Sequence, residues 1–169
     1  MRTKSFVRAR DALSQLQLDH DAIRDLLRDF DRLRLVDHDG TVGKAEIVDC
    51  LCDTLMLHAQ IKEEIFYPVV RATLGDDPGL LDAFCNHSEL YRLISQIDEL
   101  DPHDPDYDEL VGQLSDCVVP SFDQEQAVLF TRVRGAGVDT AALGRTMARR
   151  RRAQQQTFTE QDLLEQRRA

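Results

Sequence analysis

Residues 57–68 read Leu57-His-Ala-Gln-Ile-Lys-Glu-Glu-Ile-Phe-Tyr-Pro68, a stretch with helical spacing that carries a histidine at position 58. On an ideal helix, His58 shares one stripe with three apolar residues, Leu51, Leu55 and Ile65. Such a stripe is typical of a helix face that packs into a protein interior. We therefore expect a helix here, with the imidazole pointing towards the axis of a bundle.

The same helical spacing recurs along most of the chain, whereas strand-like alternation is almost absent. Glycines and Asp-Pro pairs separate the segments, because glycine commonly ends a helix and an aspartate before proline commonly opens one. The expected helices span about residues 11–36, 44–74, 77–100 and 104–134, with one more short helix near 139–147. This pattern predicts an all-α fold: an antiparallel up-down four-helix bundle with an extra short C-terminal helix.

The charge of the chain is unevenly distributed. The 169 residues have a formal net charge of −10, but residues 145–169 hold seven arginines against three carboxylates, which leaves +4 there and −14 on residues 1–144. We predict a bundle over 1–137 and a C-terminal helical segment with an Arg-rich tail over 138–169. The arginines at 149–152 are either a solvated helix end or a contact for an acidic protein partner. The overall negative charge argues against nucleic acid as the partner.

Membrane and redox signals are weak. No apolar run approaches the roughly 18 residues that a membrane span needs, and no apolar stretch follows the basic N-terminus, so we expect a cytoplasmic protein without a membrane partner. The four cysteines, Cys50, Cys52, Cys85 and Cys117, form no CxxC pair. We therefore expect them to be reduced, mostly buried thiols.

Three histidines fall on apolar stripes, one in each of the first three predicted helices: His20, His58 and His87. Burying an imidazole without a partner costs about 1–3 kcal/mol. Either each is a core histidine with its own hydrogen bonds, or a shared metal ion satisfies all three, since bundle cores commonly hold His and carboxylate metal sites.

Four motifs carry a family resemblance: Leu18-Asp-His20-Asp-Ala-Ile-Arg-Asp-Leu-Leu27, His58 to Pro68, His87-Ser-Glu-Leu-Tyr-Arg-Leu-Ile94 and Gln124-Glu125-Gln-Ala-Val-Leu-Phe130. Together they resemble the hemerythrin family, in its bacterial HHE cation-binding branch. The resemblance covers about residues 9–150, and 58–68 is its most specific part. It implies a four-helix bundle around two irons bridged by carboxylates and oxygen.

The sequence departs from the family pattern at two places. Lys62 stands where the second helix usually carries a glutamate one turn after its histidine, and Pro120-Ser121 replaces two histidines on the fourth helix. The ligand candidates that remain are His20, His58, His87 and Glu125, enough for a single ion. Lys62 is expected either to pair with Glu125 or to extend out of the bundle. Glu63 and Glu64 are expected to turn away from His58.

These observations leave three hypotheses. The first is a binding module with one ion of non-heme iron, or of zinc or manganese, that senses or stores the metal or binds dioxygen or a related small ligand. The second is a metal-free module of the same fold, with no cofactor, used for protein interaction or regulation. The third is a diiron-type protein that acts on peroxide, oxygen or nitric oxide. We expect no enzyme of another class, because the chain has no GxSxG, P-loop or HExxH motif.

Overall fold

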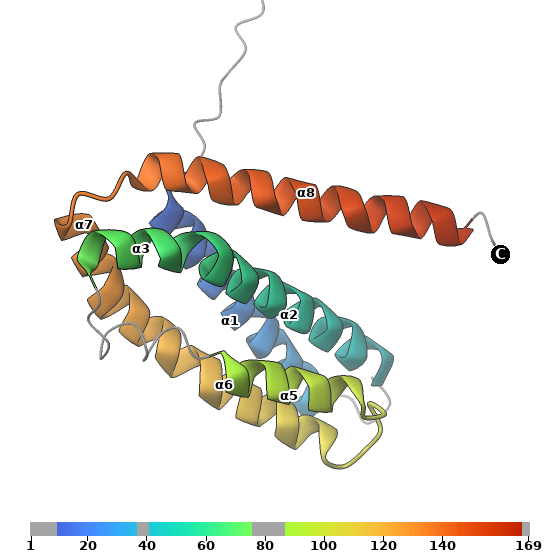
Figure 1. The fold of residues 1–169 in the computed structure, drawn as a ribbon. Coiled ribbons are helices and arrows are strands. Elements are labelled where there is room, and N and C mark those ends of the chain that lie inside the picture. The colour runs from blue at the N-terminus through green and yellow to red at the C-terminus, as the bar shows by residue number, and fades with distance from the viewer. Residues whose placement is uncertain (1–9, 37–40, 76–86, 167–169) are drawn as a thin grey trace, which may run out of the picture.

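The computed structural model describes residues 10–36, 41–75 and 87–166, and every regular element in these ranges is a helix (Figure 1). The first two long helices are α1 (Ala12–Val36) and α2 (Thr41–Ile61). A π-helical turn, η1 (Lys62–Phe66), continues α2 into α3 (Tyr67–Leu74). The remaining elements are α5 (Ser88–Asp98), α6 (Tyr107–Gln124), the π-helical turn η2 (Glu125–Leu129), α7 (Phe130–Gly135) and α8 (Thr140–Gln166).

The helices form a bundle in which α1 packs against α2 and α5 packs against α6, while α1 also contacts α6. The long helix α8 runs along one side of the bundle, against α1, α2 and η1 (Figure 1). The predicted all-α helical bundle is therefore confirmed. Within the described residues, no helix is both long and apolar enough to cross a membrane.

Two boundaries differ from those the sequence predicts. The C-terminal helix is not short: α8 has 27 residues and includes the arginines at 149–152, because the run of Ala, Arg and Gln favours helix. The third helix is described only from Ser88, and His87 directly precedes it rather than lying at mid-helix. The Asp77-Pro78 opening lies outside the described residues, as does Cys85. The division of the chain at residue 137 stays a prediction.

Helix ends follow the expected local signals. The second long helix ends at Leu74, where Gly75 adopts φ +76°, a left-handed conformation that glycine tolerates without steric cost. At the start of α8, the Asp139 carboxylate accepts a hydrogen bond of 2.8 Å from the Ala142 N–H. This contact satisfies one of the backbone donors that a helix start leaves free.

Two apolar clusters fill the core, and a polar layer lies between them. The larger cluster includes Ile23, Leu55 and Phe122, and the smaller includes Leu16 and Leu129. Along α1, α2–η1 and α6–η2, the buried polar residues stand at the boundary between the two clusters: His20, His58, Lys62 and Glu125.

Helix α8 approaches α1 closely at Gly144. A Cβ atom at this position would lie 2.5 Å from the Arg10 carbonyl oxygen and 2.8 Å from the Ala12 nitrogen. The Gln15 amide donates a hydrogen bond of 2.8 Å to the Gly144 carbonyl, and Leu143 and Met147 enter the smaller apolar cluster. The absence of a side chain at Gly144 is therefore what lets α8 lie against α1.

We predict that Gly144→Ala destabilises the protein by about 1–3 kcal/mol, because the added methyl meets backbone that cannot move aside. Alanine at a helix position without such a contact stabilises by up to about 1 kcal/mol. Gly112→Ala in α6 is the matched control, since its Cβ would meet nothing within 4 Å. Urea unfolding of both variants measures the two effects, and a Gly144→Ala protein as stable as Gly112→Ala would contradict the prediction.

Candidate metal centre

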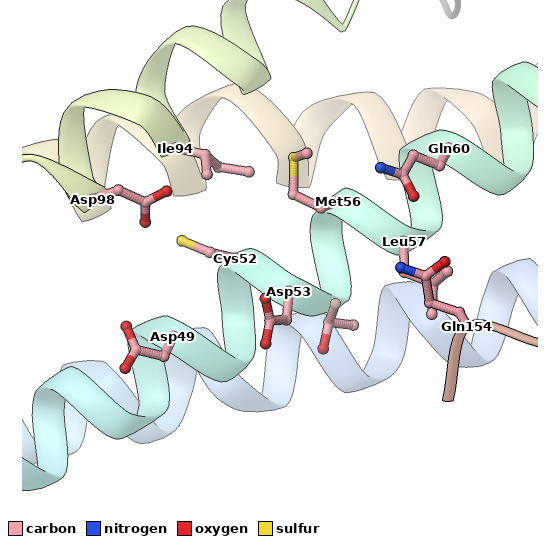
Figure 2. Close-up of a pocket in the computed structure, with 10 residues that line it drawn as sticks. Asp49, Cys52, Asp53, Met56, Leu57, Gln60, Ile94, Asp98 and Gln154 are labelled. Carbon is pink, nitrogen blue, oxygen red and sulfur yellow. The ribbon is translucent and has the colours of Figure 1, made fainter. Parts of the chain in front are cut away.

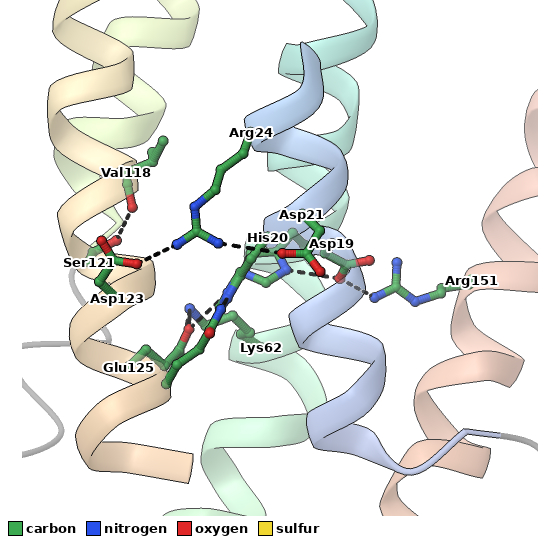
Figure 3. A network of polar contacts seen from close by, with 12 residues as sticks. Asp19, His20, Asp21, Arg24, Lys62, Val118, Ser121, Asp123, Glu125 and Arg151 are labelled. Carbon is green, nitrogen blue, oxygen red and sulfur yellow. Dashed lines mark hydrogen bonds and ion pairs between the residues drawn. The ribbon is translucent and has the colours of Figure 1, made fainter. Parts of the chain in front are cut away.

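Four buried polar residues meet inside the bundle (Figure 3). His20 comes from α1 and His58 from the last turn of α2, and both are almost completely buried. Lys62 begins η1 and Glu125 begins η2, with exposed fractions of 5% and 1%. π-Helical turns of this kind frequently occur at functional sites, and here each one starts at a residue of the polar layer.

Glu125 pairs with Lys62. The Lys62 ammonium donates a hydrogen bond of 3.0 Å to Glu125 Oε2 and lies 2.9 Å from Oε1. His20 Nε2 is 3.2 Å from the same Oε2. Burial alone would raise the pKa of Glu125, but Lys62 and the nearby histidines lower this pKa to about 2. Of the two alternatives left open by the sequence, the structure shows the Lys62–Glu125 pair, and Lys62 does not extend into solvent.

His58 is held from the side of α1 by Asp19. Its Nδ1 lies 2.9 Å from Asp19 Oδ2, and Arg151 of α8 donates a 2.5 Å hydrogen bond to the same oxygen. Burial lowers the pKa of His58 to about 4, despite the opposing effect of the Asp19 carboxylate. Burial raises the pKa of Asp19, but His58 and Arg151 outweigh it and keep this pKa below its usual value. His58 is therefore a neutral imidazole at pH 7, the form that binds metals.

His20 is oriented by an amide and by aromatic rings. The Gln126 side-chain amide lies 2.9 Å from His20 Nδ1. The imidazole stacks on Phe122 with a centroid distance of 4.0 Å, and the His58 ring meets it edge-on at 5.0 Å. These contacts hold both rings in the polar layer.

Three buried atoms in this layer make no well-aligned hydrogen bond: His20 Nε2, His58 Nε2 and Glu125 Oε1. His20 Nε2 has only the 3.2 Å contact with Glu125 Oε2, and Glu125 Oε1 only the 2.9 Å ion pair with Lys62. One ligand atom from each of the three residues lies within 4.8 Å of the others. Buried polar atoms are hydrogen-bonded in the great majority of native structures, so His58 Nε2 in particular needs an explanation. An imidazole pair and a carboxylate are a donor set that fits one divalent cation.

His87 lies beside this group rather than within it. It borders a cavity of about 170 Å³ that is also lined by His58, Lys62, Ser121 and Glu125. Its Nδ1 is 2.6 Å from Glu63 Oε1, and burial lowers the pKa of His87 although Glu63 opposes the shift. His20, His58 and Glu125 are therefore brought together, and His87 reaches the cavity at their edge. Its role as a ligand stays a prediction.

Sequence reasoning missed the residues that surround the layer: Asp19, Glu63, Gln126 and Arg151. An ideal helix rotates Glu63 away from His58, but the π-helical turn changes the register, and the Glu63 carboxylate reaches His87. The Arg-rich segment is also not simply solvated, because Arg150 pairs with Glu64 at 2.7 Å and Arg151 with Asp19. Arg145, Arg149 and Arg152 remain exposed, and a protein partner for them stays a prediction.

A second, more open hollow lies between α2 and α5, with Gln154 of α8 at its edge (Figure 2). Its volume is about 690 Å³, and it carries three aspartates, Asp49, Asp53 and Asp98, around the thiol of Cys52. Burial and these carboxylates raise the pKa of Cys52 to about 12. The thiol is therefore protonated and unreactive at neutral pH. Cys50, Cys52 and Cys117 form no disulfide, but the expectation of mostly buried thiols is wrong for them: Cys52 is buried, Cys117 is half-buried and Cys50 is exposed.

Comparison with known proteins supports the fold. No known family profile matches the chain. A crystal structure of a hemerythrin HHE cation-binding domain-containing protein from Mycobacterium kansasii superposes with a TM-score of 0.67, at 18% identity, over 83% of this chain and 85% of that one. The chain thus has the hemerythrin-like helical fold that the motifs indicated.

A shorter similarity is found to a DNA nickase from Nostoc sp. strain PCC 7120. The two proteins are 35% identical over 80 residues, which is 47% of this chain but only 22% of the nickase. The shared stretch therefore spans about a fifth of that protein.

The lowered pKa values of His58 and Glu125 predict how the folding stability of the metal-free protein depends on pH. Below about pH 6.5 the unfolded chain protonates His58, whereas the folded chain does not until about pH 4. Folding stability should therefore fall by on the order of 3 kcal/mol as pH drops through this window. Glu125 adds a further loss below its usual pKa of 4.5, because its folded pKa is about 2.

Urea unfolding at pH 7 and pH 4.5 measures this loss. His58→Gln should remove most of the pH dependence, because glutamine does not titrate. His103→Gln, at a side chain that is 76% exposed, should retain it. A pH dependence as steep in His58→Gln as in the wild type would show that another group is responsible.

Proposed function

We propose that the protein is a hemerythrin-like metal-binding module that holds one divalent ion through His20, His58 and Glu125. The observation that carries the proposal is that one ligand atom from each of these three buried residues lies within 4.8 Å of the others, while His58 Nε2 has no hydrogen-bond partner. Each buried polar atom without a partner costs about 1–3 kcal/mol. A single cation would satisfy all three, and His87 borders the cavity from which it could add a fourth ligand.

Lys62 favours one ion over two. Its ammonium lies about 3 Å from both Glu125 oxygens. A second metal ion would need Glu125 as a bridging carboxylate and would therefore lie close to this ammonium. Two unit charges 4 Å apart repel by roughly 4 kcal/mol at an effective dielectric constant of 20. The ammonium therefore replaces the second metal of a diiron site, and this disfavours diiron chemistry with peroxide, oxygen or nitric oxide.

The donor set restricts the metal to a few ions. Imidazole and carboxylate suit non-heme iron, zinc and manganese. A bound ion with an open position would supply a Lewis-acidic site for dioxygen or a related small ligand. Neutral His58 and ionised Glu125 are ready to bind without losing a proton, and Leu55 and Phe122 give the cavity apolar walls. This geometry supports sensing or storage of the metal or of its ligand.

The similarity to a nickase does not change this proposal. It covers 22% of that protein, and a chain with a net charge of −10 is a poor electrostatic partner for DNA.

One observation favours a second candidate, a metal-free interaction module. Lys62 already neutralises Glu125, so the charge of the layer is balanced without an ion. Metal analysis of the freshly purified protein separates the two: about one ion per chain supports a metal centre, and none supports the metal-free module.

His58→Ala tests the ligand assignment. We predict that it abolishes binding of the single ion, because a site with three or four ligands weakens strongly when one is lost. The measurement is metal content after loading with Fe²⁺ or Zn²⁺, with helical circular dichroism as the check of folding. His103→Ala is the matched control, since this histidine is exposed. Equal metal content in His58→Ala and the wild type would refute the assignment.

Lys62→Glu combined with Ser121→His tests the register of the site. Lys62 and Ser121 line the same cavity, so the double variant would add one carboxylate and one imidazole to the layer. We predict that it takes up more iron per chain than the wild type and gains near-ultraviolet charge-transfer absorption. Lys62→Met is the control that removes the ammonium without adding a ligand. Iron uptake no greater than that of Lys62→Met would show that residues 62 and 121 cannot bind a second ion.

A further inference from the structure

The contact between α8 and the polar layer runs through one carboxylate. Asp19 Oδ2 accepts hydrogen bonds from Arg151 at 2.5 Å and from His58 Nδ1 at 2.9 Å. The exposed fractions of the three side chains fall from Arg151 (23%) through Asp19 (14%) to His58 (3%). Figure 3 shows Arg151 reaching from α8 to Asp19 on α1. The three residues thus link the last helix of the chain to the centre of the bundle.

This contact decides which nitrogen of His58 carries the proton. A carboxylate only accepts hydrogen bonds, so the atom facing Asp19 must be an Nδ1–H donor. Nε2 then has a free lone pair. It is also the buried His58 nitrogen without a partner, in the group with His20 and Glu125. Histidines that bind metals commonly donate their other N–H to a carboxylate in this way, which fixes the tautomer and the ring orientation.

The position of Arg151 is fixed by the packing of α8. Gly144 lets α8 lie against the backbone of α1, and Leu143 and Met147 anchor the first turns in the core. Arg150 makes a separate two-pronged contact with Glu64, at 2.7 and 3.2 Å. Arg150 therefore anchors α8 to the bundle without contacting Asp19, whereas its neighbour Arg151 contacts Asp19 directly.

We propose that Arg151 is a positioning residue of the metal centre. It holds the Asp19 carboxylate in place, and Asp19 holds His58 with Nε2 free to bind the ion. The metal part of this inference rests on the proposed function, whereas the orientation of His58 does not. The C-terminal helix is accordingly part of the site, although none of its described side chains lines the cavity between His58, His87 and Glu125.

Nuclear magnetic resonance of the histidine rings tests the link in the metal-free full-length protein. Long-range ¹H–¹⁵N spectra report which ring nitrogen is protonated, a readout that a merely structural role would not move. His58 should be the Nδ1–H tautomer in the wild type, and Arg151→Gln should populate the Nε2–H tautomer. Titration with Zn²⁺ alone should show an affinity lower by about 10–100-fold in Arg151→Gln.

Two matched variants distinguish an effect of Arg151 on the orientation of His58 from an effect on the packing of α8 against the bundle. Arg151→Lys keeps a cation beside Asp19 and should restore the Nδ1–H tautomer and most of the Zn²⁺ affinity. Arg150→Gln removes the neighbouring ion pair that anchors α8 and should leave the tautomer and the affinity unchanged.

Two results would overturn the proposal: an Nε2–H tautomer of His58 in the wild type, or equal losses of affinity in Arg150→Gln and Arg151→Gln. If the wild type binds no Zn²⁺, Fe²⁺ or Mn²⁺, the proposed function fails. The tautomer spectra of the metal-free proteins would still decide whether Arg151 acts on His58.

Discussion

The buried ion pair between Lys62 and Glu125 is the constraint on which the rest of the polar layer depends. Leaving either charge alone in the core would cost several kcal/mol. The helical segments α2–η1 and α6–η2 must therefore keep the register that brings Lys62 next to Glu125. That register brings Glu125 to His20 and places the layer between the two apolar clusters. The pair also starts both π-helical turns, so the irregular backbone and the buried charges occur at the same positions.

The Lys62 ammonium is a cation that the chain itself supplies, so a metal ion is not needed to balance the charge of Glu125. Glu125 is ionised and compensated before any ion binds, so the fold of the bundle does not depend on metal to neutralise its core. What remains without a well-aligned hydrogen bond is local: the two Nε2 atoms and one carboxylate oxygen. Under the proposed function, a metal ion would complete a site that is already formed, rather than drive folding as it does in much smaller domains.

Two kinds of signal indicate the inner residues of the candidate site in the sequence. Helical periodicity places His20 and His58 on apolar stripes, whereas Glu125 was indicated by the family resemblance. The position of Lys62 was left open between a pair with Glu125 and an extended side chain. Neither signal indicated the contacts of Asp19 and Glu63. Asp19 contacts His58 across the interface between two helices, and helical periodicity does not predict which residues meet there. The contact of Glu63 with His87 depends on a π-helical turn that no residue pattern predicted.

The basic C-terminal segment shows that the distribution of charge along the sequence does not predict which charges pair in the fold. A surplus of arginine beyond an acidic body suggested either solvation or an external partner, yet Arg150 and Arg151 find their carboxylates on the body itself. Part of the charge asymmetry is therefore used inside the protein, where arginines of α8 pair with carboxylates of the bundle and hold α8 against it. Since Asp19 contacts both Arg151 and His58, the outermost polar contact of the site comes from beyond residue 137. A boundary drawn at residue 137 would therefore divide the residues of this polar contact, with Asp19 and His58 on one side and Arg151 on the other.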